Sequence, residues 1–215
     1  MKFLLINIFV AGLLVSCKTT TSESTPPPKS SLHHAAHIGD IETVKQHLDI
    51  GADPNLKTKI IGWSPLAEAR SMDIIVLLVD AGANVNDVGN GETALHRHYY
   101  RSPEIMRFLV SKGVDVNAVD NFGNTVFHEV VDDVKGSLVE RAMVRVKILI
   151  DAGARINAVD KDGMTVLDRF LEGLKLNLKY KSYKRENYIK EMSDMLKLLL
   201  SHGAKTVEQL KAEVK

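Results

Sequence analysis

Apolar residues through most of this chain recur at the three- and four-residue spacing that is typical of amphipathic helices. In the first such stretch, Ala35 and Ala36 fall on one face of a short helix, and Val44 and Leu48 fall on one face of a second. A Gly-Asp turn separates the two helices. Gly51 follows the second, where a residue without a Cβ readily adopts the left-handed conformation that ends a helix. The pattern predicts two short helices joined by a tight turn.

The same pattern of two helices and a glycine stop repeats along the chain. The stop glycines at positions 51, 82, 113, 153 and 203 are 31, 31, 40 and 50 residues apart, and all but the one at 113 are followed by alanine. A period of about 33 residues with two helices in each unit indicates a solenoid of stacked repeats. We number the five units in chain order.

Two further motifs recur between the helices. The later units open on similar tetrapeptides, SPLA at 64–67, TALH at 93–96, TVFH at 125–128 and TVLD at 165–168, and the turns NAVDNFG (117–123) and NAVDKDG (157–163) precede two of them. From about Ser31 to the C-terminus, these anchors resemble the ankyrin-repeat family. The resemblance implies an all-α ankyrin-repeat solenoid of about five helix-turn-helix units with short hairpin-like turns, and a role as a binding scaffold.

Units two and three show how the helices are expected to begin. Unit two, from residue 64 to 82, is shortened between its helices, so we expect a brief first helix and a second that Asp73 opens. In unit three, Ser102 is expected to cap the second helix and Pro103 to occupy its first position, where a missing N–H costs nothing.

Units four and five are about seven and about seventeen residues longer than the usual repeat. Helical spacing after Gly136 predicts an extended second helix in unit four. In unit five, residues 174–180 fit both helical spacing and strand-like alternation, and we favour a helix to about residue 179. Residues 179–185 (KYKSYKR) are then a basic loop, and residues 206–214 are expected to form a polar capping helix.

The first sixteen residues have the features of an export signal. Lys2 is followed by the apolar run FLLINIFVAGLLV, which is too short to span a bilayer and suits the core of a signal peptide. The run ends in Leu14-Val15-Ser16-Cys17, which resembles the bacterial lipoprotein box. The resemblance implies cleavage before Cys17 and acylation of that cysteine. The alternative is an ordinary secretory leader with a chance cysteine.

The residues after Cys17 indicate the membrane in which the protein would be anchored. By the same resemblance, Lys18 in place of aspartate favours the outer membrane, with the protein lipid-anchored on the periplasmic face. Residues 18–30 (KTTTSESTPPPKS) cannot bury a core and are interpreted as a Ser/Thr/Pro tether. The chain is therefore divided into a signal peptide (1–16), an acylated cysteine with its tether (17–30) and a repeat domain (31–215).

Charge and chemistry exclude several classes of function. Removing Lys2 with the leader takes the formal net charge from +1 to 0, so nucleic-acid binding is not indicated. The sequence holds no phosphate-binding glycine loop and no Gly-x-Ser-x-Gly motif, and its one thiol, Cys17, is assigned to acylation. Asp120 and Asp160 fit turn residues that bond their own backbone. We therefore predict no enzyme, no catalytic residues and no cofactor.

The resemblance to ankyrin repeats gives three histidines a structural interpretation. His33, His96 and His128 occupy the position of the Thr-Pro-Leu-His motif whose imidazole joins the turns of adjacent units. His33 and His37 are also one helical turn apart, a spacing that could hold zinc. No cysteine or carboxylate near them in the sequence completes such a site, so no metal is predicted.

The surface of the turns and first helices is the predicted binding site. In ankyrin arrays, partners usually contact the hairpin tips and the first-helix face, and the residues that map there are Lys59, Ile60, Trp63, Asn90, Glu92, Tyr99, Tyr100, Asn121, Phe122, Lys161, Asp162 and Met164. The four aromatic side chains among them are of the kind enriched at binding hot spots. Each could instead pack against the next unit. The basic loop is either a solvated edge or a docking site for a protein or a lipid headgroup.

These features predict a membrane-anchored module that binds another protein. Similar bacterial ankyrin lipoproteins are often partners of a neighbouring secreted toxin, so the resemblance implies an immunity protein that neutralises a toxic effector such as a lipase. The alternative is a structural or stress-related periplasmic scaffold with an endogenous partner. A toxin gene beside this one would favour the first.

Overall fold

The computed structural model describes residues 27–133, 139–180 and 186–214, and the predictions for Cys17 and for most of the basic loop therefore lie outside the described residues. Eleven helices and two short strands follow one another in these ranges: α1 (Leu32–Ile38), α2 (Ile41–Asp49), α3 (Pro65–Glu68), α4 (Met72–Asp80), β1 (Val88–Gly89), β2 (Glu92–Thr93), α5 (Ala94–His98), α6 (Pro103–Ser111), α7 (Val126–Asp132), α8 (Val139–Asp151), α9 (Val166–Tyr180), α10 (Glu186–Ser201) and α11 (Val207–Glu213).

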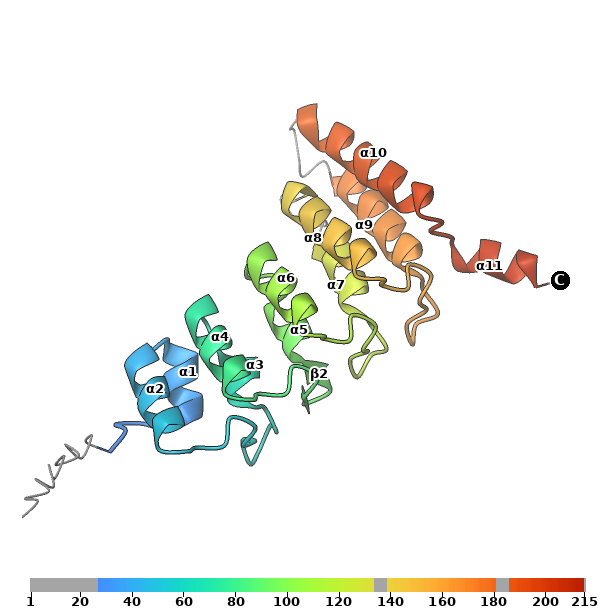
Figure 1. The fold of residues 1–215 in the computed structure, drawn as a ribbon. Helices are drawn as coiled ribbons and strands as arrows, with labels where there is room; N and C mark the ends of the chain where they lie inside the picture. The colour runs from blue at the N-terminus through green and yellow to red at the C-terminus, as the bar shows by residue number, and fades with distance from the viewer. Residues whose placement is uncertain (1–26, 134–138, 181–185, 215) are drawn as a thin grey trace, which may run out of the picture.

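The helices form five pairs that stack side by side, α1 with α2 through α9 with α10 (Figure 1). Loops leave each pair on the same side of the stack before the next pair begins. This arrangement confirms the predicted all-α solenoid. Within the described residues, no helix has the length and apolarity that crossing a bilayer requires.

Short hairpins precede the first helices of units three to five. In unit three, β1 pairs antiparallel with β2, and isolated bridges join Val119 to Thr125 and Val159 to Thr165 at the corresponding places. The unit-three turn is made by Asn90 and Gly91, whose φ angles are 49° and 80°. Two consecutive positive φ values are the requirement of a tight two-residue hairpin turn, and Asn-Gly is the dipeptide that meets it most easily.

Side-chain oxygens cap most helix starts, because the first N–H groups of a helix have no partner within it. Ser102 caps α6 and Pro103 opens it, as predicted. The brief first helix of unit two is also confirmed, but the expectation that Asp73 opens the second is wrong. Ser71 caps α4, because its extended backbone directs the hydroxyl to the N–H three residues on, while Asp73 lies inside the first turn.

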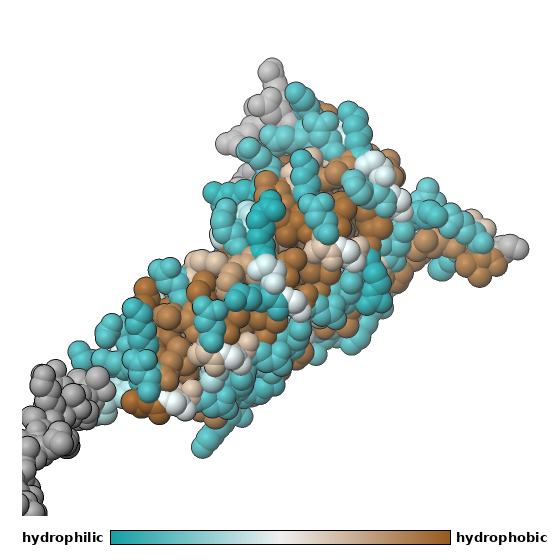
Figure 2. Space-filling view, in the orientation of Figure 1, coloured by the Kyte–Doolittle hydropathy of each residue, from teal (hydrophilic) through white to brown (hydrophobic). Residues whose placement is uncertain are grey.

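The core runs without a break from unit to unit. Leu66, Leu95, Leu149 and Leu199, one from each of units two to five, have no exposed surface. Apolar residues also appear on the face seen in Figure 2, between rows of hydrophilic side chains along the stack. Each unit thus buries apolar side chains between its own two helices and against its neighbours, as expected of a solenoid.

A ladder of asparagines joins successive loops. Each amide nitrogen donates to the carbonyl of the next unit's stop glycine, at 2.9–3.4 Å, and each amide oxygen accepts the N–H two residues beyond that glycine, at 2.7–2.8 Å. The residues of this asparagine ladder are Asn55, Asn86, Asn117 and Asn157. The ladder satisfies backbone groups that helix ends leave without partners.

The enlarged units have long helices, as predicted. In unit four α8 has 13 residues, and in unit five α9 and α10 have 15 and 16. Helix α9 continues to Tyr180, so residues 179–180 of the expected basic loop belong to the helix. Helix α11 begins after Thr206 as expected, and none of its residues is buried, as expected of a polar helix at the end of the array.

Candidate protein-binding surface

Three histidines join the first helices to the next unit's loop. The Nε2 atoms of His33, His96 and His128 lie 3.1, 3.3 and 3.2 Å from the carbonyl oxygens of Trp63, Asn124 and Ala158. Burial lowers the pKa of His96 and of His128, which keeps both imidazoles neutral. These contacts confirm the structural interpretation. Among the described residues, no group of three potential ligands could hold a metal ion.

Unit five replaces this histidine with Asp168. Its carboxylate accepts hydrogen bonds from the backbone N–H and the hydroxyl of Thr165, and from the N–H of Val207 at 2.9 Å. The first helix of unit five therefore still bonds the segment that follows the unit. Its carboxylate accepts a hydrogen bond from an N–H at the start of α11, whereas the imidazoles of the other units bond a carbonyl. The TVLD motif alone does not show that the aspartate accepts a hydrogen bond where the histidines of the other units donate one.

Asp120 and Asp160 organise the turns of units four and five, as predicted. The Oδ1 atom of Asp120 accepts from the N–H groups of Phe122 and Asn124, both at 2.8 Å. Asp160 makes the corresponding two bonds in its own turn, both at 2.9 Å. Each aspartate therefore shapes a hairpin.

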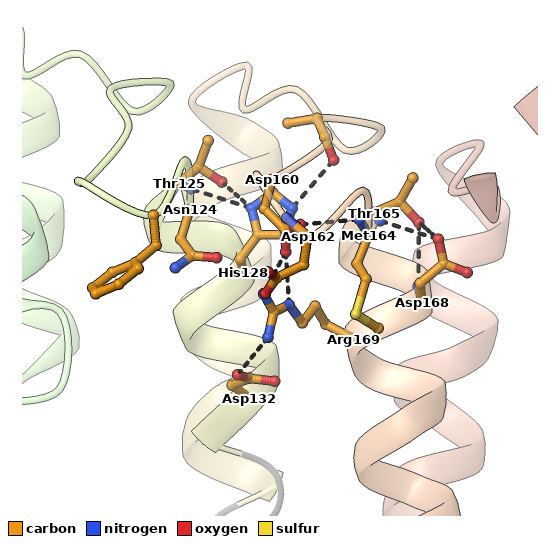
Figure 3. Close-up of polar contacts among 12 residues, drawn as sticks. Asn124, Thr125, His128, Asp132, Asp160, Asp162, Met164, Thr165, Asp168 and Arg169 are labelled. Carbon is orange, nitrogen blue, oxygen red and sulfur yellow. Dashed lines mark hydrogen bonds and ion pairs between the residues drawn. The ribbon is translucent and has the colours of Figure 1, made fainter.

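Asp160 also belongs to a charged network that the sequence did not reveal (Figure 3). Arg169 on α9 donates through Nε to Asp160 at 2.7 Å and through Nη2 to Asp162 at 2.8 Å, and its Nη1 lies 3.9 Å from Asp132 on α7. The Asp160 side chain has no exposed surface. Burial opposes its ionisation, but bonds from Met164 N–H and from Arg169 leave its pKa below the ordinary value.

Trp63 is held against unit three. Its indole nitrogen donates to the carbonyl of Gly89 at 3.2 Å, and the Arg97 guanidinium lies 4.0 Å from the ring centroid. A Cβ on Gly89 would come within 2.5 Å of the indole, so only glycine fits there. The half-buried Trp63 is thus packed against the next unit, the alternative that the sequence left open for each aromatic residue.

Other members of the predicted set are open to solvent. Ile60 is 95% exposed and Phe122 is 71% exposed, and both lie in turns between helix pairs. The remaining exposed members are Lys59, Asn90, Tyr100, Asn121, Lys161 and Asp162, whereas Glu92, Tyr99 and Met164 are half-buried. Large apolar side chains at this exposure are available to a partner.

Hydrogen bonds hold neighbouring tips in place. The Asn121 amide donates to the carbonyl of Asn90 at 2.8 Å, which ties the unit-four tip to the unit-three tip. The N–H of Lys161 donates to the carbonyl of Phe122 at 3.1 Å, and the Lys161 ammonium donates to the carbonyl of Asn121. We name the surface of Asn90, Asn121, Phe122 and Lys161 the tip surface. It is ordered before any partner arrives.

Tyr99 and Tyr100 lie apart from the tip surface. They follow the C-terminal end of α5, whereas the hairpin precedes its N-terminal end. The Tyr100 carbonyl accepts from Arg145 of α8 at 2.8 Å, and burial, then the charge of Asp133, raises the pKa of Tyr99. The structure therefore divides the predicted residues between two ends of the first helices, a division that turn motifs alone do not show.

Glu129 is a further residue that the sequence did not single out. It follows His128 on α7, at the position that Arg97 and Arg169 occupy in units three and five. One of its carboxyl oxygens is buried and makes no hydrogen bond. Burial, reinforced by the nearby charge of Asp120 and other acids, raises the pKa of Glu129 to about 8. The Glu129 carboxyl is therefore mostly neutral at pH 7.

Comparison with known proteins agrees with the stacked helix pairs. Residues 32–120 match the family model described as ankyrin repeats (3 copies). The chain is 36% identical over 111 residues to the E3 ubiquitin-protein ligase KEG of Arabidopsis thaliana, which covers 48% of this chain and 7% of that protein. It is 31% identical over 102 residues to the transient receptor potential cation channel subfamily A member 1 homolog of Caenorhabditis elegans. That alignment covers 46% of this chain and 8% of that protein.

The chain thus spans less than a tenth of the length of either curated relative. The family match and the stacked helix pairs together establish the fold as an ankyrin-repeat solenoid. Ankyrin repeats generally bind other proteins, so the match supports the coarse prediction of a binding module.

Proposed function

We propose that this ankyrin-repeat solenoid binds another protein through the tip surface. The observation that carries the proposal is Phe122, an aromatic side chain 71% exposed on a turn that is hydrogen-bonded to both neighbouring tips. A large apolar group exposed on a rigid element can bury its surface in a partner with little ordering cost. Ile60, at the tip of unit two, extends the same kind of surface toward the N-terminus.

Phe122→Ala tests the proposal. We expect it to weaken partner binding by about 30-fold, which corresponds to about 2 kcal/mol for a hot-spot aromatic. It should leave the thermal midpoint nearly unchanged, since the side chain has little buried contact to lose. The partner would first be captured by crosslinking in envelope fractions and identified by mass spectrometry, and affinity would then be measured by titration.

Ile50→Ala is the matched control, because Ile50 is 62% exposed at the end of α2 and is not part of the tip surface. Full affinity in the Phe122 variant would place the interface elsewhere. Trp63→Ala is a poorer test, since the indole also joins units two and three, and its loss would lower stability and affinity together.

The finer proposal is an immunity protein that neutralises a secreted toxic effector such as a lipase. Its support is the resemblance to bacterial ankyrin lipoproteins together with a preformed binding surface. The second candidate, a periplasmic scaffold with an endogenous partner, uses the same surface. The two are separated by the neighbouring gene: where it encodes a toxin, co-expression should leave cells alive with the unchanged chain and not with the Phe122 variant.

The proposed location is the periplasmic face of the outer membrane, anchored through acylated Cys17. The support is the apolar run that ends at the cysteine and the Ser/Thr/Pro tether that follows it. More than one acyl chain makes anchoring durable. Cys17→Ser should abolish lipidation and release the protein from the outer-membrane fraction, measured by fractionation and immunoblotting. A serine variant that stays with the outer membrane as fully as the unchanged chain would contradict the anchor.

A further inference from the structure

The joint between units two and three contains an unusual buried histidine. His98 lies on α5 with no exposed surface, and its Nε2 donates to the carbonyl of Leu66 on α3 at 2.7 Å. Its other ring nitrogen, Nδ1, is buried and makes no hydrogen bond. His98 is thus held in one neutral tautomer, with a protonatable atom facing no acceptor.

The shortness of α3 explains why a histidine fits there. α3 ends after four residues, and the N–H of Arg70, which would continue the helix, bonds the carbonyl of Ala36 in unit one instead. His98 donates to the Leu66 carbonyl, which the N–H of Arg70 would bond if the helix continued. The imidazole therefore takes the place of a helical donor at this joint.

The charged groups around His98 do not favour a positive imidazole. Arg101 and Arg97, on or just beyond its own helix, are the charges that act on it most strongly. The acids of α3, β2 and α6, which pack against α5, either pair with other residues or are exposed. Glu68 of α3 lies 3.7 Å from His37, Glu92 of β2 pairs with Arg97, and Glu104 of α6 is exposed. A proton on Nδ1 would be buried without a compensating charge.

We propose that His98 makes the joint between units two and three an acid-sensitive switch, which opens as the pH falls. Opening exposes the imidazole, so the proton binds to the open form. The Trp63–Arg97 contact lies at the same joint, so opening also dismantles the first-helix face between these units. The proposal does not depend on which partner the protein binds.

The sign and the pH window follow from linkage. Burial lowers the pKa of His98 from its ordinary value of 6.5 to about 4, so the open form takes up the proton first. The stability of the joint is fully present above pH 6.5 and is lost as the pH falls toward 4. With one proton taken up on opening, the equilibrium shifts by up to about tenfold per pH unit in this window.

His98→Gln tests the switch in the full chain. Glutamine can still donate to the Leu66 carbonyl, but it does not titrate. Hydrogen exchange, corrected for the intrinsic pH dependence of exchange, should show protection in α1–α4 falling up to about tenfold per pH unit below 6.5 in the unchanged chain. The glutamine variant should lose most of this dependence in α1–α4. Any pH dependence that His96 and His128 give to the later joints should be the same in both proteins.

Two controls keep the result unambiguous. His34→Gln replaces an exposed imidazole in unit one and should preserve the pH dependence. If the glutamine at 98 prevents folding, NMR titration of the His98 ring in the unchanged chain decides the matter. A ring that titrates near 6.5, or an acid-induced opening that persists in the folded glutamine variant, would overturn the proposal.

Discussion

Replacing Leu149 by alanine is expected to lower the free energy of unfolding by about 2–5 kcal/mol, because a buried leucine leaves both lost transfer energy and a cavity. Leu149 has no exposed surface and lies on α8, which packs between α6 and α10. In a solenoid each unit contacts only its neighbours, so the cavity in unit four also weakens the coupling of that unit to units three and five. Urea denaturation followed by circular dichroism measures the change.

Val144→Ala is the control for Leu149, since Val144 lies on the same helix and is 37% exposed. It should change the free energy of unfolding by no more than about 0.5 kcal/mol. Leu95→Ala, in the centre of unit three, should behave as Leu149→Ala does. A denaturation midpoint that the Leu149 substitution leaves unaltered would mean that α8 does not carry the core as described.

Asp160→Ala is the second substitution with a large expected effect, a loss of about 3 kcal/mol or more. The substitution removes two turn bonds and leaves Arg169, whose side chain is 16% exposed, without its closest partner. Removing one member of a buried ion pair is costly because the remaining charge stays desolvated. Thermal and denaturant unfolding measure the loss.

Asp120→Ala separates the two contributions. Asp120 makes the same two turn bonds in unit four, and its carboxylate accepts from Asn124 where that of Asp160 binds Arg169. The difference between the two variants is therefore the contribution of the Arg169 contacts relative to that of the Asn124 bond. Equal losses in both would show that the Arg169 network adds nothing to stability, as is common for more exposed ion pairs.

Local patterns were sufficient for much of the fold. Helical periodicity and stop glycines predicted the helix pairs, and the Asp120 and Asp160 turns followed from side chains that bond their own backbone. The histidine contacts followed from a recurring motif. Helix starts were less certain, because Ser71 and Asp73 are both good capping residues and only the backbone conformation distinguishes them.

Contacts between units could not be predicted in the same way. Trp63 is half-buried because Gly89, in the next unit, leaves room for its ring, and no spacing within one unit shows this. The Arg169 network collects acids from α7 and from the hairpin before α9. The buried state of His98 depends on the length of a helix in the unit before it. The exposure of Phe122 was open for the same reason.

The asparagine ladder has a consequence for how such a chain can change in length. Its acceptor bonds join residues 29, 29, 38 and 48 apart in sequence, yet all four are 2.7–2.8 Å long. The extra residues of units four and five therefore leave the spacing at the loops unaltered. Insertions of this kind can lengthen helices at the far end of a unit while the pitch of the array is kept, so repeats of unequal size remain compatible within one array.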